Sequence, residues 1–376
     1  MKVHILYEFK DYPWGGGNQF LGALRRHFIR QGVYETDPGQ ADIILFNSID
    51  LIASLPAIRK INPQAVFIHR MDGVFRLHRK TAGVTQDKIS YLANRFISDA
   101  TVFQSIWSME SHIRQGFPEQ SNCIVILNAA DTDIFTPKNI SSYAPVDCIK
   151  GILATQAKTD GLVPDGHNRI VKLVASSWST NPKKGFDILQ YLDDHLDFDQ
   201  IEMSFIGNSP VKFKHIKMLG SMRSAELSKA LQASDLFVSA VEDDTCSNAL
   251  LEALACGLPC VARRSGANPE ILAKSQHTNF MFNGKNDVLA TLNLAIEALG
   301  RTGDKIEATR FDETAEQYIS FMRSLHLNPA RKRITTCSRI WFAVMLTYYG
   351  RVVRFQRYRQ RMLEWFHKII IHPNRQ

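Results

Sequence analysis

The chain has 376 residues, of which 45% are hydrophobic and 22% charged, a composition typical of a globular protein with roughly two to three domains. It contains no run of about 18 apolar residues, and its first residues lack the long apolar region and small-residue cleavage site of a signal peptide, so no transmembrane helix or secretory leader is predicted. The net charge of +8 is uneven, because residues 331–376 carry eleven Lys or Arg and one acid, which leaves −2 for residues 1–330.

Short apolar, β-rich runs alternate with segments of helical period along the chain. The first series comprises strands at 3–7, 42–47, 65–70, 101–104 and 124–127, with helices between them such as 18–29 and 87–96. The second series comprises strands at 170–176, 202–206, 216–219, 235–239 and 259–262 and helices at 184–196, 225–233, 248–256 and 269–274, followed by a late helix at 313–325. This alternation predicts βαβ units and parallel sheets.

The two series predict two doubly wound, Rossmann-like α/β domains. The polar segment without clear period between them is read as a linker or surface loop. The predicted organisation is an N-terminal domain over 1–140, a linker over 141–168, a C-terminal domain over 169–328 and a basic amphipathic helical tail over 329–376. Ligands of such sheets bind outside the carboxyl ends of the strands, so the loops that follow the strands are the candidate sites.

The stretch 239–270 carries the most specific pattern. It reads as a strand end, an acidic loop, a short helix, a buried strand and a second helix start. Ser247 is a good N-cap residue, and the free N–H groups near Ser247, Asn248 and Ala249 favour a phosphate next to the helix N-terminus.

Two carboxylates, Asp244 and Glu252, lie eight residues apart across the same junction. At this junction both carboxylates are positioned to accept hydrogen bonds from sugar hydroxyls. Together with the helix N-terminus they predict a site for a phosphorylated sugar. The alternative is that Asp244 belongs to a solvated acidic run and that Glu252 forms an ordinary salt bridge within its helix.

Three other loops carry candidate residues. The glycines of 15–17 follow the first strand and allow close backbone approach to a ligand, although a flexible loop explains them equally and they form neither a GxGxxG fingerprint nor a P-loop. The end of a buried strand carries His69, Arg70 and Asp72. One interpretation is that these residues contact substrate. The alternative is that His69 is structural and that Arg70 and Asp72 pair with each other.

Lys183 and Lys184 open the helix after the first strand of the second domain. They are candidates for binding phosphate, or they belong to a solvated helix start. The pair Asp131 and Asp133 forms a D-x-D pattern, but two doubly wound series do not suit the fold in which that pattern binds a metal. The six cysteines show no CxxC pair and are expected to be reduced thiols.

The stretch from Asp244 through Glu252 to Ala262 resembles the carboxylate-x7-Glu motif of the retaining glycosyltransferases of family 4, which have the GT-B fold. Residues 266–271 resemble the G-x-P-E-I element and residues 127–137 the N-G-V-D-x-x-x-F-x-P loop of that family. The resemblance extends over about 1–328. Two positions depart from the pattern: Asp244 stands where Glu is more usual, and Ser179 stands where the family has an Arg, with Lys183 or Arg263 as substitutes.

The resemblance implies a metal-independent, retaining transferase without a cofactor. It would move a sugar from a nucleotide-diphosphate sugar to a glycan or lipid-linked glycan, in cell-surface polysaccharide synthesis, with the acceptor on the N-terminal domain and the donor on the C-terminal domain. The implied catalytic residues are Asp244, His69 and Lys184, the donor-binding residues are Gly16, Gly17, Lys183, Lys184, Ser247, Asn248, Ala249 and Glu252, and the acceptor-side residues are Arg70 and Asp72, with no metal ligand.

The tail has apolar residues spaced mostly three and four apart, with Arg and Lys beside them, which predicts an amphipathic helix. It suits an anionic membrane surface, and packing on the body of the protein or binding of nucleic acid are the alternatives. We expect a cytoplasmic protein, peripheral on the cytoplasmic face of the membrane. The competing functions are a catalytically weak, membrane-tethered binding or scaffold protein of the same fold, and another GT-B activity such as nucleotide-sugar epimerisation.

Overall fold

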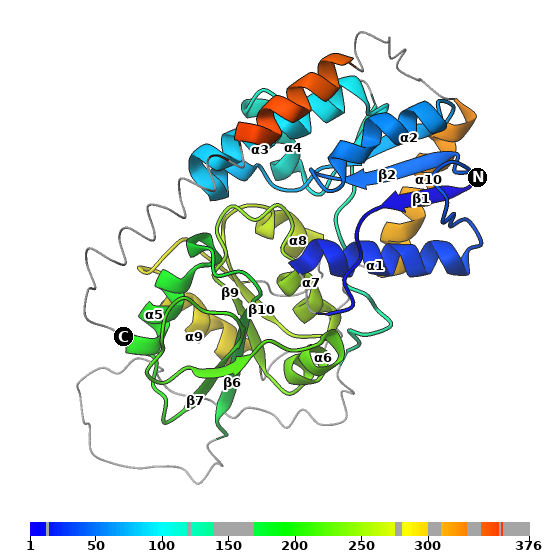
Figure 1. Cartoon of the computed structure of the whole chain (residues 1–376). Helices are drawn as coiled ribbons and strands as arrows, with labels where there is room; N and C mark the ends of the chain where they lie inside the picture. The colour runs from blue at the N-terminus through cyan, green and yellow to red at the C-terminus, as the bar shows by residue number, and fades with distance from the viewer. Residues whose placement is uncertain are drawn as a thin grey trace, which may run out of the picture.

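A computed structural model describes residues 1–12, 15–118, 122–137, 169–274, 280–299, 310–328, 340–352 and 355. They form two α/β domains that lie side by side (Figure 1). The predicted linker over 141–168 and most of the predicted tail lie outside the described residues.

The first domain is built on a parallel sheet in the order β1-β2-β3-β4-β5. Its strands are β1 (Val3–Leu6), β2 (Ile43–Asn47), β3 (Val66–Arg70), β4 (Ala100–Phe103) and β5 (Cys123–Val125). The helices of this part of the chain are α1 (Gly15–Arg30), η1 (Ile52–Ser54), α2 (Leu55–Ile61), α3 (Phe75–Phe96) and α4 (Ile106–Arg114). Alternate residues of each strand point to opposite faces, so strands buried on both sides need helices on both faces.

One face of this sheet is covered by α1 and by α10 (Phe311–Leu327). The side chains of Phe311, Tyr318 and Met322 on α10 are buried in the same cluster as strand residues of the first domain. This corrects the predicted boundary at 328, because α10 follows the second domain in sequence but buries its apolar face against the first.

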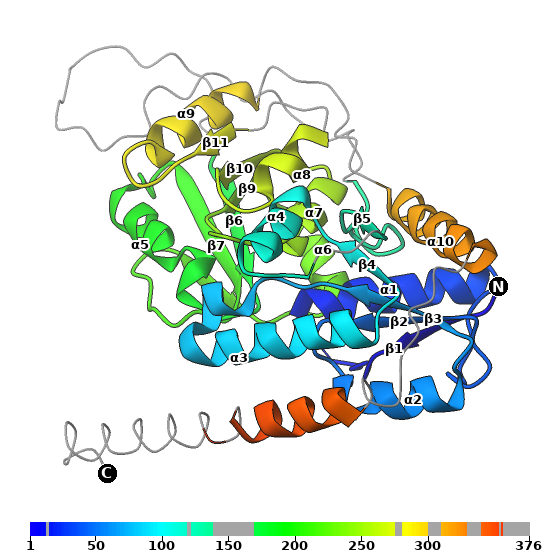
Figure 2. The ribbon, with the colours of Figure 1, turned by 90° about the horizontal axis from the view of Figure 1, so that it is seen from above.

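The other face is covered by α2, α3 and a helix over 340–352, which Figure 2 shows together on one side of the sheet. Phe342 is buried in this cluster, with Leu346 and Tyr349 packed beside it. A helix is therefore confirmed in the described part of the tail, and it packs on the body through these three residues. Trp341 and Tyr348, two other apolar residues of this helix, are exposed.

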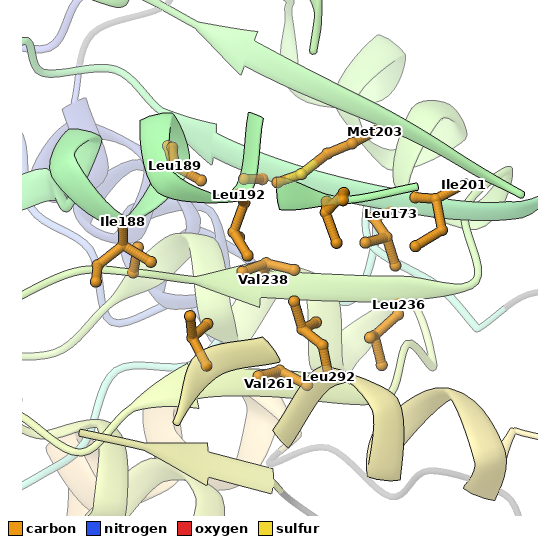
Figure 3. Packing of buried hydrophobic residues seen from close by; sticks show 14 of the residues in the cluster. Leu173, Ile188, Leu189, Leu192, Ile201, Met203, Leu236, Val238, Val261 and Leu292 are labelled. Carbon is orange, nitrogen blue, oxygen red and sulfur yellow. The ribbon is translucent and has the colours of Figure 1, made fainter. Parts of the chain in front are cut away.

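The second domain is built on a parallel sheet in the order β11-β10-β9-β6-β7-β8. Its strands are β6 (Val171–Ser177), β7 (Ile201–Gly207), β8 (Lys217–Gly220), β9 (Leu236–Ser239), β10 (Cys260–Arg263) and β11 (Phe280–Phe282). Its helices are η3 (Pro182–Lys184), α5 (Phe186–His195), α6 (Ser224–Gln232), α7 (Asn248–Ala255), α8 (Asn268–Lys274) and α9 (Val288–Ala298). Figure 3 shows the core between the sheet and its helices, where Leu192 and Leu292 approach Val238 and Val261 of the central strands.

The strand order of the second sheet reverses between β6 and β9. From this point the chain runs outward in one direction through β7 and β8 and in the other through β10 and β11. The loops that follow β6 and β9 therefore open next to each other, and this crevice is the usual ligand site of a doubly wound sheet. All pairings in both sheets are parallel, as predicted.

Candidate functional site

A cavity of about 470 Å³ lies between the two domains at this crevice. Nine of the twelve predicted site residues line it: Gly16, Gly17, Asp72, Lys184, Asp244, Ser247, Asn248, Ala249 and Glu252. The remaining three, His69, Arg70 and Lys183, do not. The structure thus brings together loops that lie more than 200 residues apart in the chain.

The glycine loop forms the N-terminal wall of the cavity, and residues 15–17 are the first turn of α1 rather than a free loop. A Cβ atom added to Gly16 would lie 1.8 Å from Nδ2 of Asn248 in the other domain. Asn128 donates a hydrogen bond from its Nδ2 to Oδ1 of Asn248 at 3.1 Å. The backbone of Gly16 thus lies close to the start of α7, while the predicted close approach to a ligand stays a prediction.

The N-terminus of α7 forms part of the opposite wall. Ser247 is the N-cap, as predicted, and its Oγ accepts a hydrogen bond from the backbone N–H of Leu250 at 3.4 Å. The first N–H groups of a helix have no acceptor within the helix, and the helix dipole is positive at this end. Asn248 and Ala249 line the cavity at this point, so the wall offers backbone donors and positive potential to an anion.

The acidic loop that follows β9 is neutralised residue by residue. Glu242 pairs with Arg263 at 3.2 Å, Asp243 pairs with Lys183, and Asp244 pairs with Lys184 at 2.7 Å. The acids are therefore not a free solvated run.

The lysines reach this loop because the turn that carries them is pressed against the end of β9. Gly185 has φ 80, and a Cβ atom there would lie 2.1 Å from the carbonyl oxygen of Ala240. Asn181 caps the turn by accepting a hydrogen bond from the backbone N–H of Lys183 at 3.0 Å. Lys184 is left on the cavity side of the turn, where its ammonium group lies against Asp244.

Asp244 is held in its charged form although its side chain is only 17% exposed. Burial alone would raise the pKa of this carboxyl, but the Lys184 ammonium and the backbone N–H of Cys246 hold the pKa below its usual value. The Asp244–Lys184 pair is thus a fixed ion pair in the cavity wall.

Glu252 lies in the same wall with a different environment. Burial raises the pKa of Glu252 to about 8. Among the described residues no cation pairs with it, in contrast to the helix salt bridge that was the alternative interpretation. A carboxyl that is largely protonated near neutral pH both donates and accepts a hydrogen bond, which suits a pair of neighbouring hydroxyl groups.

Asp72 faces the cavity from the first domain at the end of a polar network. Its Oδ1 accepts hydrogen bonds from Nε2 of Gln104 at 2.8 Å and from Arg70 at 3.2 Å. Gln104 in turn accepts from Asn128 at 2.9 Å, and Asn128 reaches Asn248 across the domains. The network fixes the direction of the Asp72 carboxylate toward the cavity.

His69 does not contact the cavity, and the predicted sugar contact is corrected. Its side chain is fully buried within β3, where Nε2 donates to the carbonyl of Ser48 at 2.9 Å and Nδ1 accepts from Asn94 at 3.1 Å. Burial lowers the pKa of His69 to about 3, so the imidazole is neutral. The interpretation of His69 as a structural histidine fits the structure.

Arg70 and Lys183 do not line the cavity either. Arg70 is fully buried, and it donates to Asn47 at 2.6 Å and to Asn128 at 2.8 Å in addition to Asp72. Arg70 therefore orients the polar network instead of facing an acceptor. Lys183 is paired with Asp243, so neither it nor Arg263 supplies a second cation to the cavity.

Arg79 is a charged cavity residue that was not predicted from the sequence. It lies in the first turns of α3, donates from Nη1 to Oε1 of Gln86 at 3.1 Å, and packs over the ring of Phe75 with its Cζ 4.9 Å from the centroid. The predicted helix began only at 87, because the segment before it is basic and has a weak apolar period. Its neighbour His78 accepts a hydrogen bond at its carbonyl from Asn181 of the other domain at 3.3 Å, which holds this turn against the lysine loop.

Two further contacts set the distance between the cavity walls. Glu270 accepts hydrogen bonds from the backbone N–H groups of Ile106 and Trp107, at 2.8 and 2.6 Å, and so caps the N-terminus of α4 from the other domain. Ser105 donates to the carbonyl oxygen of Thr245 at 2.7 Å. These contacts hold the acidic loop and α8 against the first domain.

The D-x-D carboxylates pair with arginines of α1. Asp131 pairs with Arg26, and Asp133 pairs with Arg30 at 2.6 Å. Neither carboxylate lines the cavity between the domains.

Comparison with known proteins identifies relatives for the second domain. Residues 180–300 match the model of the family described as glycosyl transferases group 1. Sulfoquinovosyl transferase SQD2 of Arabidopsis thaliana is 33% identical over 111 residues, which are 27% of this chain and 21% of that protein. The match thus spans about a fifth of the length of the curated relative.

Solved structures are similar over most of the chain. HepE from Anabaena, in complex with UDP and glucose, has a TM-score of 0.60 at 14% identity and covers 86% of this chain and 100% of its own. The catalytic domain of starch synthase IV from Arabidopsis thaliana, bound to ADP and acarbose, has a TM-score of 0.56 at 13% identity and covers 87% and 99%. The fold is therefore the GT-B fold, as predicted. The family match supports a glycosyltransferase, while assignment to family 4 stays a prediction.

Proposed function

We propose that this protein is a metal-independent, retaining glycosyltransferase that moves a sugar from a nucleotide-diphosphate sugar to a glycan or lipid-linked glycan. The observation that carries the proposal is the shared cavity wall, where the N-terminus of α7, Lys184 and Glu252 line one space. The related structures that contain UDP with glucose, or ADP, support the choice of a nucleotide sugar as donor.

Each group in the wall has a role in this proposal. The leaving diphosphate, whose negative charge grows, is stabilised by the backbone N–H groups at Asn248 and Ala249 and by the Lys184 ammonium. Protein groups alone therefore provide the electrostatic stabilisation. The protonated carboxyl of Glu252 binds the ribose hydroxyls. Asp244 accepts hydrogen bonds from the transferred sugar.

The reaction proceeds on one face of the sugar. The bond between the anomeric carbon and the diphosphate oxygen breaks while an acceptor oxygen bonds to the same face of that carbon. A phosphate oxygen of the leaving group takes the acceptor proton. Asp72, whose carboxylate is fixed by Gln104 and faces the cavity from the first domain, contacts the acceptor in this arrangement.

A screen of donor hydrolysis across purified nucleotide sugars, followed by calorimetric titration of the donors, tests the proposal. Turnover of one donor supports it, and the absence of both binding and turnover for every nucleotide sugar would overturn it. The pairing of Lys184 with Asp244 favours a second candidate, a catalytically weak binding or scaffold protein of the same fold. Conversion of a donor into an isomeric nucleotide sugar without acceptor would instead indicate an epimerase.

Arg79 supplies the second cation for the diphosphate in this proposal. Lys184 and Arg79 are the two Lys or Arg side chains that line the described cavity, one from each domain. Replacing Arg79 with Met is expected to raise the KM for the donor roughly 10- to 100-fold, because a charge-assisted contact to a phosphate is lost. Steady-state kinetics with Lys88→Met, an exposed position on the same helix, as the control measure this. Equal kinetics in the two variants would remove Arg79 from the site.

We further propose a peripheral position on the cytoplasmic face of an anionic membrane, in cell-surface polysaccharide synthesis. In the part of the chain that the structure describes, no helix is long and apolar enough to cross a bilayer. Helix 340–352 instead exposes Trp341, Val344 and Tyr348 on its outer face, and Phe355 follows in the same register. A stripe of aromatic residues in a segment of net charge +10 suits the interface of a bilayer with anionic headgroups.

The membrane proposal is tested with the outer face of this helix. Replacing Trp341, Tyr348 and Phe355 with Ser is expected to reduce co-sedimentation with anionic liposomes at least about fivefold, since the apolar area that enters the interface is removed. The fold should persist, because the helix packs on the body through Phe342 on its other face. Binding of the wild type should require anionic lipid and weaken with salt. Undiminished sedimentation of the triple variant would contradict the assignment.

A further inference from the structure

A second cavity lies between α1 and the start of α6, beside the donor cavity. Its volume is about 480 Å³. Gln19 and Ser224 line both cavities, and Oγ of Ser224 donates to Oε1 of Gln19 at 3.1 Å. This hydrogen bond between the two domains separates the donor cavity from the second cavity. A molecule bound in one cavity therefore lies next to the other cavity.

The lining of the second cavity is rich in basic side chains. Lys10, Arg25, Arg26 and Arg223 line it, against the single acid Asp11. Lys10 is paired with Glu8, and Arg26 is paired with Asp131.

Arg25 and Arg223 differ from the other two cations, because neither has an acidic partner among the residues that the structure describes. Arg25 comes from α1 of the first domain and Arg223 from the N-cap of α6 in the second. The nearby acid Glu226 is already engaged, since it accepts the backbone N–H of Arg223 at 3.0 Å. One cavity is thus lined by two arginines, one from each domain, that have no acidic partner among the described residues.

Arg25 is held in place without an anion. Its Cζ lies 4.9 Å from the ring centroid of Phe9 and 5.4 Å from that of Tyr34. Its Nε is buried and has no hydrogen-bond acceptor. Stacking on two rings restricts the guanidinium group, so binding an anion costs little further side-chain entropy. A half-buried cation with an unsatisfied donor is expected to gain from an oxyanion.

We infer that the second cavity binds a phosphate group, bridged by Arg25 from the first domain and Arg223 from the second. Guanidinium groups bind phosphate with paired hydrogen bonds, and a phosphate has enough oxygen atoms to accept from two arginines that line one cavity. The phosphate is carried by the acceptor or by a free phosphorylated effector. Assignment to an acceptor rests on the proposed function, whereas the binding of phosphate does not.

The test is a calorimetric titration of pyrophosphate into the full chain, with and without saturating UDP. We expect one pyrophosphate site to persist in the presence of UDP. Arg223→Met and Arg25→Met should each weaken this site about tenfold or more. Because Arg223 is exposed, the Arg223→Met variant is expected to fold. It tests the site even if loss of the stacked side chain destabilises the Arg25→Met variant.

The matched control is the double variant Arg30→Met/Lys229→Met, which removes charges from the same two helices at positions outside the cavity. Its affinity should equal that of the wild type. No pyrophosphate binding in the presence of UDP, or equal affinity in the Arg223→Met variant, would overturn the inference. If UDP itself does not bind, the screen of nucleotide sugars decides the donor proposal, and the comparison of the variants still decides the pyrophosphate site.

Donor hydrolysis distinguishes the two sources of the phosphate. A rate that changes with added pyrophosphate in the wild type, but not in Arg223→Met, identifies a free effector. A rate that stays constant, with pyrophosphate binding intact, identifies a phosphate carried by the acceptor.

Discussion

Replacing Lys184 with Met is expected to lower kcat/KM for the nucleotide sugar about 100- to 1,000-fold. The substitution removes the cation next to the N-terminus of α7, where the leaving diphosphate gains charge. It also leaves the carboxylate of Asp244 without the ammonium group 2.7 Å away that holds its pKa down. Asp244 would then repel the diphosphate or take up a proton. Single-turnover and steady-state kinetics with the donor measure the loss.

Lys183→Met is the matched control for this experiment. Lys183 is the adjacent residue with the same side chain, but it pairs with Asp243 and does not line the cavity. The control should keep kcat/KM within about threefold of the wild type. If the two variants lose activity equally, the defect comes from the whole turn and Lys184 has no specific role with the diphosphate.

Replacing Glu252 with Ala is expected to lower kcat/KM roughly 10- to 100-fold, mainly through KM. The carboxyl is the polar side chain of α7 that lines the cavity beyond the helix N-terminus, and its loss leaves two donor hydroxyls unpaired. Glu252→Gln should retain most of the affinity near neutral pH, since an amide replaces a protonated carboxyl with similar shape and donors. Glu242→Ala, at an acid paired outside the cavity, serves as the control. Wild-type affinity of Glu252→Ala for every donor would contradict the ribose contact.

The same residue makes stability depend on pH. Burial raises the pKa of Glu252 from its usual 4.5 to about 8 in the folded protein. Between these values the folded state keeps a proton that the unfolded state has released, so the free energy of unfolding falls as the pH rises and levels off above about 8. Glu252→Gln should be stabilised relative to the wild type at about pH 9 and unchanged at about pH 4. Urea denaturation across this range checks the sign, and a difference that grows toward acid would refute it.

The cavity wall formed by the second domain was predictable because its pattern is local. Ser247, Asn248, Ala249 and Glu252 lie within six consecutive residues at a helix start, and helix capping fixes the direction of their groups whatever surrounds them. Asp244 and Lys184 were also placed correctly at the cavity. Their ion pair was not foreseen, since 60 residues separate them and only the strand order brings the two loops together.

The cavity wall formed by the first domain was less predictable, because the role of each residue there depends on where its side chain points and how deeply it is buried. His69, Arg70 and Asp72 are nearly adjacent, yet His69 and Arg70 are buried and Asp72 faces the cavity. A strand end identifies the edge of a sheet, but the packing of neighbouring helices decides which side chain is covered. Arg79 was missed because the helix was predicted to begin at 87, whereas α3 begins at Phe75.

By itself, the sequence determined the two α/β domains, the parallel strands, the capped helix α7 and the carboxylates near it, because hydrophobic period, turn residues and caps act over a few neighbouring residues. Only the tertiary structure decided which charges remain available. Asp243 and Asp244 pair with the two lysines of one turn and Glu242 pairs with Arg263. Helix α10 packs on the first domain, and Arg79, Arg25 and Arg223 line the cavities between the domains. Ion pairing and burial depend on distances between distant segments, which the order of strands sets and local sequence does not encode.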